Sequence, residues 1–188
     1  MTKESQKTNT MTAEETARQN SFIELAKTLT AQKSNTLGRP LTYCLTTFGC
    51  QMNEKQSEVV AGIMDEIGYH RQDNEEADVV IYNTCTVREN ANLKVYGRLG
   101  HLHSLKDKNP DMKIILFGCM MQEPHVVEKI KKTYPFVNLV LEPTIFLNLP
   151  SCFMICSSLN SRLLISGKEQ IRSWRICRQE RNYTFKSG

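Results

Sequence analysis

Short apolar runs alternate with segments of helical periodicity through the middle of the chain. Four runs have the length and composition of buried β-strands: LTYCLTTF (41–48), ADVVIYN (77–83), MKIILFG (112–118) and FVNLVL (136–141). A helical pattern follows each of the first three runs. Strands that alternate with helices predict right-handed crossovers and a mostly parallel sheet flanked by helices. We therefore expect an α/β fold in this part of the chain.

The predicted helices begin and end at residues that favour helix ends. Asn53 can cap the first helix with Gln56 as its capping-box partner, and Gly68 can close it. The second helix is expected over about residues 88–106, and Pro124 suits the first turn of the third. The apolar stripes of the first two helices are Val59, Val60, Ile63, Met64 and Ile67, and Leu93, Tyr96, Leu99 and Leu102.

The chain outside this pattern contains little that predicts packing. Residues 1–39 have few large apolar side chains and predict a flexible arm, in which SFIELAKTL (21–29) forms only one or two short amphipathic turns. After Glu142 the alternation stops, and no helical or strand period follows. We therefore expect three parts: an irregular N-terminal arm (1–39), an α/β domain (40–141) and a poorly structured C-terminal tail (142–188).

Composition and charge constrain the partners of this protein. The chain is 40% hydrophobic, and no apolar run approaches the roughly 20 residues that span a bilayer, so we expect a cytoplasmic protein without a membrane partner. The net charge is +4, but residues 151–188 hold seven Lys or Arg against two Asp or Glu. The first 150 residues therefore hold 17 basic and 18 acidic side chains, which predicts weak binding of RNA by the α/β domain itself.

Three of the seven cysteines recur at the same place in the predicted pattern. Cys50, Cys85 and Cys119 each follow a predicted strand, at intervals of 35 and 34 residues. Because parallel strands end at one edge of their sheet, these thiols are expected to converge there. Three thiolates suit an iron–sulfur cluster with one open iron, or a zinc ion with one open position. Gly49 and Gly118 would allow the backbone to approach such a group closely.

The other candidate residues favour structural roles. One cysteine alone at a strand end is more often a buried small hydrophobe than a ligand, so only the recurrence favours a metal site. Cys44 lies within a predicted strand and is expected to fill the core. Cys152 and Cys156 would begin a CxxxCxxC motif, but its third position is Leu159, so we interpret their spacing as coincidence. We expect His101 and His103 to be solvated helix residues and Met120 and Met121 to pack, whereas His70 and His125 stand isolated in the sequence.

The three recurring cysteines stand in longer segments: TFGCQMNEKQSE (47–58), ADVVIYNTCTVRENANLKVYGRLG (77–100) and IILFGCMMQE (114–123). In order and spacing these segments resemble the amino-terminal domain of the radical-SAM methylthiotransferase family. The resemblance covers about residues 41–140. It implies that Cys50, Cys85 and Cys119 bind an auxiliary 4Fe-4S cluster.

Residues beside the cysteines narrow the resemblance to one branch of that family. Gln51, Met52 and Asn53 follow the first cysteine, and the segment TVRE (86–89) follows the second. Both are similar to the branch that inserts sulfur at C2 of N6-isopentenyladenosine beside the tRNA anticodon and then methylates it. The resemblance implies tRNA as a partner. In full-length members a radical-SAM barrel binds a second 4Fe-4S cluster and S-adenosylmethionine.

The sequence departs from the family after the fourth predicted strand. Glu142 and Pro143 stand where the family has Gly-Thr, and only ERNYTFKSG (180–188) again resembles family sequence. The stretch between resembles nothing in the family, which suggests a truncated or frame-disturbed chain without the barrel. We therefore expect a methylthiotransferase by family that is inactive as this chain alone, and a monomer. Two alternatives remain open: a stand-alone iron–sulfur or zinc module that carries sulfur, and an α/β domain with only structural cysteines.

Overall fold

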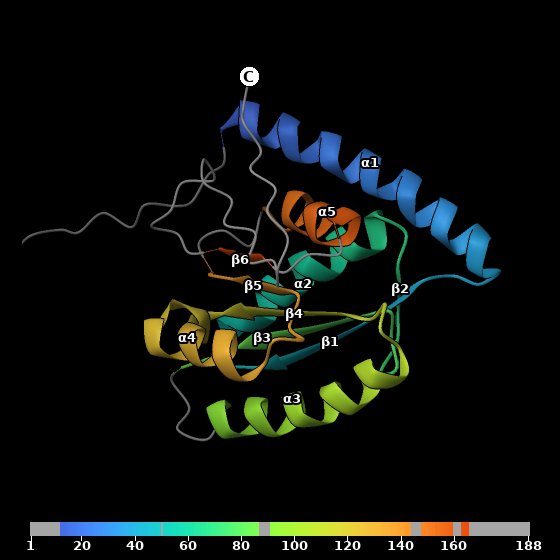
Figure 1. Cartoon of the computed structure of the whole chain (residues 1–188). Coiled ribbons are helices and arrows are strands. Elements are labelled where there is room, and N and C mark those ends of the chain that lie inside the picture. Colours follow the sequence, from blue (N-terminus) through green and yellow to red (C-terminus); the bar gives the residue numbers. More distant parts are fainter. Residues whose placement is uncertain (1–11, 50, 87–90, 144–147, 160–162, 166–188) are drawn as a thin grey trace, which may run out of the picture.

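The centre of the protein is a parallel sheet of six strands in the order β2-β1-β3-β4-β5-β6 (Figure 1). The computed structural model describes residues 12–49, 51–86, 91–143, 148–159 and 163–165. The strands are β1 (Thr42–Phe48), β2 (His70–Arg71), β3 (Val79–Thr84), β4 (Lys113–Gly118), β5 (Leu139–Leu141) and β6 (Leu163–Ile165). The α/β fold and the parallel sheet expected from the sequence are confirmed.

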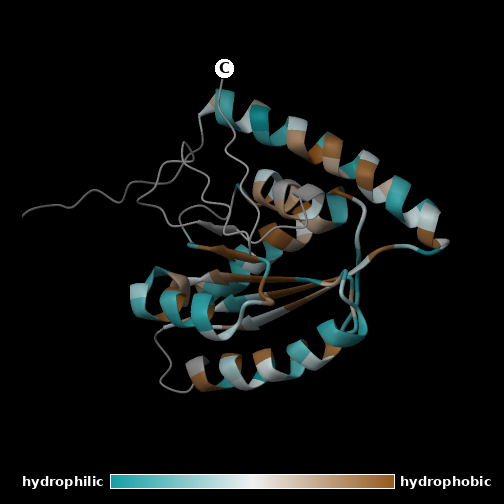
Figure 2. Ribbon diagram, viewed as in Figure 1, coloured by the Kyte–Doolittle hydropathy of each residue, from teal (hydrophilic) through white to brown (hydrophobic). Residues whose placement is uncertain are grey.

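Helices cover both faces of this sheet. They are α1 (Ala13–Leu37), α2 (Gln51–Glu66), α3 (Ala91–Lys108), α4 (Pro124–Thr133) and α5 (Leu149–Leu159), with a short 3₁₀ helix, η1 (Cys119–Gln122). One face packs against α2 and α5, with α1 outside them, and the other packs against α3 and α4 (Figure 1). In Figure 2 the inner strands carry much of the hydrophobic colour, because β3 and β4 are buried along their whole length. None of the helices in the described part of the chain has the length and apolar character of a membrane span.

Details of two helices differ from the sequence-based expectation. Because α2 already begins at Gln51, Asn53 lies inside its first turn instead of capping it, and its side chain is buried. In α3, Leu93 is 70% exposed and Val95 is fully buried, so the buried stripe begins at a different residue from the predicted one. Gly68 follows α2 with a positive φ of 93°, in keeping with the predicted end of this helix.

Residues 13–37 form the helix α1 where the sequence suggested an irregular arm. Thr12 caps the helix by accepting a 3.2 Å hydrogen bond from the backbone N–H of Glu15, and Gly38 ends it with a φ of 67°. The buried face of α1 has regular helical spacing but is half polar, which hides it from a search for apolar periodicity. Its residues are Gln19, Ile23, Ala26 and Thr30.

The segment after Glu142, expected to be a poorly structured tail, packs on the domain where the structure describes it. Leu149, Cys152 and Phe153 of α5 are buried, and the Phe153 ring meets the Tyr69 ring edge to face with 5.7 Å between their centroids. Since α5 is buried on most of its sides, it shows no amphipathic period. β6 then extends the sheet beside β5. Residues 166–188 lie outside the described part, and there the expectation stays a prediction.

Candidate metal centre

The carboxyl ends of β1, β3 and β4 lie in register at one edge of the sheet. Phe48 pairs with Thr84, and Thr84 pairs with Gly118, so the last residues of these strands form one row. Cys85 and Cys119 are the next residues after Thr84 and Gly118. Because neighbouring strands lie about 4.8 Å apart, both cysteines leave the sheet from adjacent positions. The structure thus places two of the three predicted ligands at one edge.

The third predicted ligand, Cys50, lies outside the described residues. Within those residues no group of three His, Cys, Asp or Glu side chains is arranged to hold a metal ion, so the three-cysteine site stays a prediction. The donor chemistry nevertheless fits an iron–sulfur cluster, because thiolates are its usual ligands. Cys85 is 1% exposed and Cys119 is partly exposed at the start of η1. One predicted ligand is therefore shielded from water, while the other borders the surface.

A buried network of amides and hydroxyls lies at the same edge. Asn53 Nδ2 donates hydrogen bonds to Asn83 Oδ1 (2.7 Å) and to the backbone oxygen of Thr84 (3.0 Å). In return, Asn83 Nδ2 donates to the backbone oxygen of Asn53 (2.7 Å) and to Ser57 Oγ (3.0 Å). The hydroxyls of Ser57 and Thr47 lie 2.8 Å apart and complete this amide network. It joins the first turns of α2 to the ends of β1 and β3.

Sequence reasoning missed the amide network and assigned Asn53 to a helix cap. One signal was available, because Asn83 and Thr84 are polar residues that end an otherwise apolar strand. Both are fully buried, and buried polar side chains need hydrogen-bond partners. A polar pair in such a strand therefore predicts a buried partner, although the sequence does not say which residue supplies it.

Glycines precede two of the predicted ligands, and both leave room for the amide network. A Cβ on Gly49 would lie 2.5 Å from Asn53 Cγ. Gly118 has a φ of 113°, and a Cβ there would lie 2.2 Å from the Thr84 backbone oxygen and 2.7 Å from Asn83 Oδ1. The sequence suggested that these glycines allow close approach to a bound group. The structure shows that neighbouring protein atoms already require them.

The other described cysteines are core residues, as predicted for Cys44 but not for Cys152 and Cys156, which belong to the segment expected to be poorly structured. Cys44, Cys152 and Cys156 are at most 3% exposed. Burial raises the pKa of the Cys44 thiol, and burial raises the pKa of the Cys152 thiol to about 12. The Cys156 thiol donates to the backbone oxygen of Asn138 at 3.4 Å. The raised pKa values of Cys44 and Cys152 disfavour the thiolate form that metals bind. Cys177 lies outside the described residues.

The histidines and the adjacent methionines also take the expected structural positions. The side chains of His101 and His103 are 59% and 58% exposed on α3, and His70 and His125 are exposed as well. Met120 and Met121 are buried in the core. No described histidine belongs to a group of three or more side chains that could hold a metal ion.

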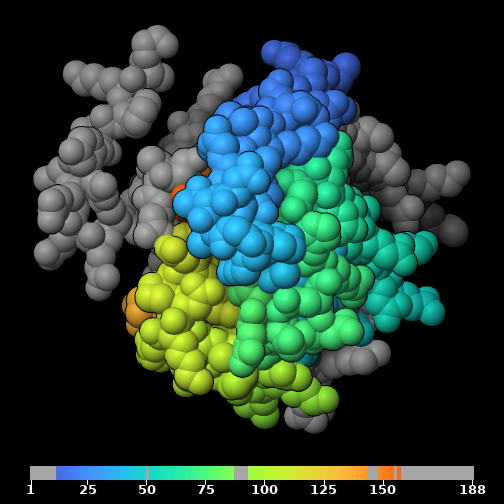
Figure 3. Space-filling model, turned by 90° about the vertical axis from the view of Figure 1, so that its right-hand side faces the viewer, coloured from blue at the N-terminus to red at the C-terminus, as the bar shows by residue number. Residues whose placement is uncertain are grey.

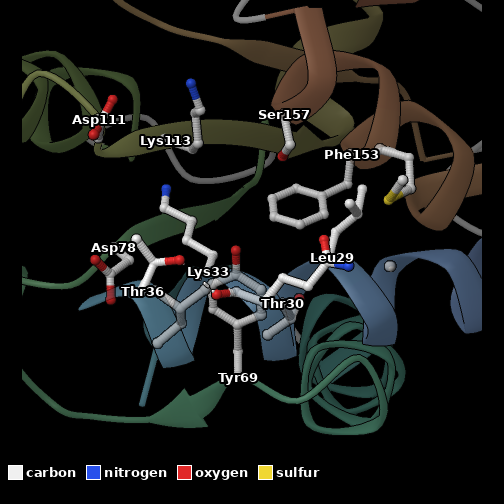
Figure 4. Close-up of a pocket in the computed structure, with 14 residues that line it drawn as sticks. Leu29, Thr30, Lys33, Thr36, Tyr69, Asp78, Asp111, Lys113, Phe153 and Ser157 are labelled. Atoms are coloured by element: carbon white, nitrogen blue, oxygen red, sulfur yellow. Dashed lines mark hydrogen bonds between the residues drawn. The ribbon is translucent and has the colours of Figure 1, made fainter. Parts of the chain in front are cut away.

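A separate cavity of about 640 Å³ opens at the opposite edge, where the strands begin. Figure 3 shows this side of the molecule, with α1 lying across it beside the segment that precedes β4. Lys33, Lys113 and Asp111 give the cavity both signs of charge, and Phe153 forms an apolar wall (Figure 4). Burial lowers the pKa of Lys113. The cavity lies apart from Cys85 and Cys119, and its mixed lining favours no single class of ligand.

Comparison with known proteins adds a family and close relatives. Residues 42–142 match the model of "Uncharacterized protein family UPF0004". A curated relative from Lachnoclostridium phytofermentans is 49% identical over 166 residues, which cover 88% of this chain and 36% of the relative. Relatives from Acetivibrio thermocellus and Clostridioides difficile are 57% and 48% identical over 68% and 70% of this chain, and over 27% and 28% of their own lengths. All three are named tRNA-2-methylthio-N(6)-dimethylallyladenosine synthase.

The comparisons change the interpretation of the segment after the fourth predicted strand. A match of 166 residues within a chain of 188 must include residues 23–166. Residues 143–166 therefore align with a relative, whereas the sequence alone suggested that this stretch resembles nothing in the family. This agrees with the packing of α5 and β6 on the domain. The chain spans about a third of the length of the curated relatives that it matches.

Proposed function

This chain belongs to the UPF0004 family, and on that basis we propose that it is the cluster-binding part of a tRNA methylthiotransferase. The observation that carries the proposal is the common edge from which Cys85 and Cys119 leave in-register strands. The names of the relatives support the substrate class, because all three are synthases of a methylthiolated nucleoside in tRNA.

In this proposal Cys50, Cys85 and Cys119 hold a 4Fe-4S cluster. A cluster with three cysteine ligands would offer one iron without a protein ligand, as the place where sulfur is bound and donated. The protein supplies thiols that lose their protons on binding, and the burial of Cys85 keeps water from one side of the centre. The partial exposure of Cys119 leaves the other side open to a reactant.

The proposed reaction of the whole protein is methylthiolation at C2 of N6-isopentenyladenosine beside the anticodon of tRNA. This reaction also needs S-adenosylmethionine and a second 4Fe-4S cluster with three further cysteines. Cys44, Cys152 and Cys156 are buried in the core and do not suit that role. We therefore propose that this chain alone is inactive, that tRNA is the partner of the whole protein, and that the protein acts as a monomer in the cytoplasm, where this substrate occurs.

Anaerobic reconstitution of the chain with iron and sulfide tests the metal centre. The expected product has bound iron, bound sulfide and the broad visible absorbance of a 4Fe-4S cluster. The matched control carries alanine at Cys50, Cys85 and Cys119 together, and it should bind no cluster. Equal iron content in the two proteins would contradict the proposal.

A further inference from the structure

We propose that Asn53 is a positioning residue for the metal centre, because its side chain holds together the chain segments that carry the predicted ligands. This inference rests on the proposed function. It is drawn from the amide network, which touches the residue immediately before each of the three cysteines. These residues are Gly49, Thr84 and Gly118.

The contact with Thr84 is the most direct of the three. Asn53 Nδ2 donates to the Thr84 backbone oxygen at 3.0 Å, and that oxygen belongs to the peptide group that joins Thr84 to Cys85. A peptide group is planar, and the sheet pairing of Thr84 with Gly118 holds the Thr84 Cα, so holding the oxygen as well restricts the position of the Cys85 backbone nitrogen. The hydrogen bond therefore helps to orient the peptide through which Cys85 leaves β3.

The same side chain is close to the segment that carries Cys50. Asn53 is three residues after Cys50, and its side chain lies over Gly49, where a Cβ would come within 2.5 Å of Asn53 Cγ. Asn83 returns a 2.7 Å hydrogen bond to the Asn53 backbone oxygen, which ties the first turn of α2 to β3. The spacing between the two ligand segments is thus determined by a reciprocal pair of amides.

The third segment is held by shape and by one hydroxyl. Gly118 has no Cβ, which allows the Thr84 peptide and Asn83 Oδ1 to lie against it. Thr84 Oγ1 donates to the Phe117 backbone oxygen at 2.8 Å and links β3 to β4 two residues before Cys119. Since Asn53 and Asn83 are at most 1% exposed, water does not compete for these hydrogen bonds.

The substitution Asn53→Asp removes the donor with almost no change in shape. It places a carboxylate oxygen opposite two acceptors, Asn83 Oδ1 and the Thr84 backbone oxygen, which repel it. Ser57→Ala is the matched control, because Ser57 lies one turn later on α2 and bonds to Asn83 and Thr47 but not to Thr84. Asn53→Ser is a second variant that shortens the side chain without adding charge.

The first measurement is the loss of iron from the reconstituted chain to a chelator without oxygen. Asn53→Asp should lose iron about 10- to 100-fold faster than the unmodified chain, in the range known for residues that orient metal ligands, whereas Ser57→Ala should stay within about twofold. The electron paramagnetic resonance spectrum of the reduced cluster should change in Asn53→Asp and not in Ser57→Ala. Equal release rates and spectra would overturn the inference.

The second measurement needs no metal. In the metal-free chain, alkylation of Cys85, followed by mass spectrometry, should be faster in Asn53→Asp and Asn53→Ser than in Ser57→Ala. Faster iron release without faster alkylation would overturn the inference, because the effect would not pass through Cys85. Loss of the folded state in both Asn53 variants, with Ser57→Ala folded, would assign Asn53 to stability alone and also overturn it. If the unmodified chain binds no cluster, the proposed function fails, and alkylation alone decides the role of Asn53.

Discussion

Gln19 and Ser151 are separated by 132 residues, and their side chains form a buried hydrogen bond of 3.3 Å between α1 and α5. The backbone N–H of Ser151 also donates to Gln19 Oε1 at 3.3 Å. Together with Ile23 and Ala26, these contacts cover α5 on the side away from the sheet. The two segments that flank the predicted α/β domain thus stabilise each other.

This arrangement predicts that Phe153 contributes strongly to stability. Phe153 is 3% exposed and packs on Tyr69, so Phe153→Ala should lower the free energy of unfolding by about 3 kcal/mol or more. The control Leu25→Ala removes a side chain that is 50% exposed on α1 and should cost less than about 0.5 kcal/mol. Urea denaturation of both variants measures the difference. Equal, small losses would show that α5 does not pack as described.

The cysteine assignment predicts a clear division among single alanine variants. Substitution of Cys50, Cys85 or Cys119 should remove most of the iron that the chain binds after reconstitution. Substitution of Cys44, Cys152, Cys156 or Cys177 should leave the iron content unchanged. The variants at the buried positions Cys44, Cys152 and Cys156 should be somewhat less stable than the unmodified chain. Iron and sulfide analysis of purified protein provides the measurement. A chain that needs Cys152 or Cys156 but not Cys50 would refute the assignment.

Gly118 is predicted to tolerate no side chain. Its φ of 113° is strained for other residues, and a Cβ would lie 2.2 Å from the Thr84 backbone oxygen. Gly118→Ala should therefore destabilise the chain by more than about 2 kcal/mol and weaken iron binding. Gly100→Ala is the control, because nothing lies within 4 Å of its Cβ position on α3. Since alanine favours a helix more than glycine does, this substitution should stabilise the fold by up to about 1 kcal/mol. The midpoint temperature of thermal unfolding should fall in Gly118→Ala and rise in Gly100→Ala, each relative to the unmodified chain.

The ion pair between Arg39 and Asp78 predicts a pH-dependent contribution to stability. Burial acts to raise the pKa of the Asp78 carboxyl, but hydrogen bonds from Arg39 (2.8 Å) and from the Thr42 backbone N–H (2.9 Å) outweigh it and hold the pKa below its usual value. The stabilisation is therefore complete above the unfolded-state pKa, about 3.9, and is lost as the pH falls through the lower folded-state pKa.

Asp78→Asn should accordingly cost about 1 kcal/mol at pH 7, a modest effect since the Arg39 side chain is half exposed. The difference from the unmodified chain should disappear in acid, below the folded-state pKa. Denaturant titrations at neutral and acidic pH test this. Asp107→Asn changes a carboxylate that is 71% exposed and should have little effect at either pH. A constant difference between Asp78→Asn and the unmodified chain at all pH values would contradict the prediction.

The chain alone is predicted to leave tRNA unmodified, even with an assembled cluster. The cysteines outside the predicted centre that the structure describes are all buried, so they cannot form the second cluster that a radical reaction needs. The chain should be incubated with isopentenylated tRNA, reductant and S-adenosylmethionine, and the nucleosides analysed by mass spectrometry. Methylthiolated adenosine above the level of a protein-free control would contradict this prediction.

The sheet was predictable because strands covered on both faces appear in the sequence as continuous apolar runs. The edge position of Cys85 and Cys119 followed, because each comes directly after such a run. The helix α1 was not, since Gln19 and Thr30 occupy half of its buried face. Its partner α5 was missed for the opposite reason, because it is buried on most sides and has no polar face to define a period. Asn53 was misassigned because a capping pattern is local, whereas its true partners, Asn83 and Thr84, lie 30 and 31 residues away.

The row formed by Phe48, Thr84 and Gly118 would also make the proposed metal centre a reporter of folding. No two of the predicted ligands belong to the same strand–helix unit, so local structure alone cannot bring them together. Two crossovers must close, and β1, β3 and β4 must pair without a slip of even one residue, before the thiols meet. A cluster bound only by that correctly paired state would add its binding free energy to the native fold and none to misregistered forms. Retention of the cluster would then distinguish correctly folded chains from compact but misassembled ones.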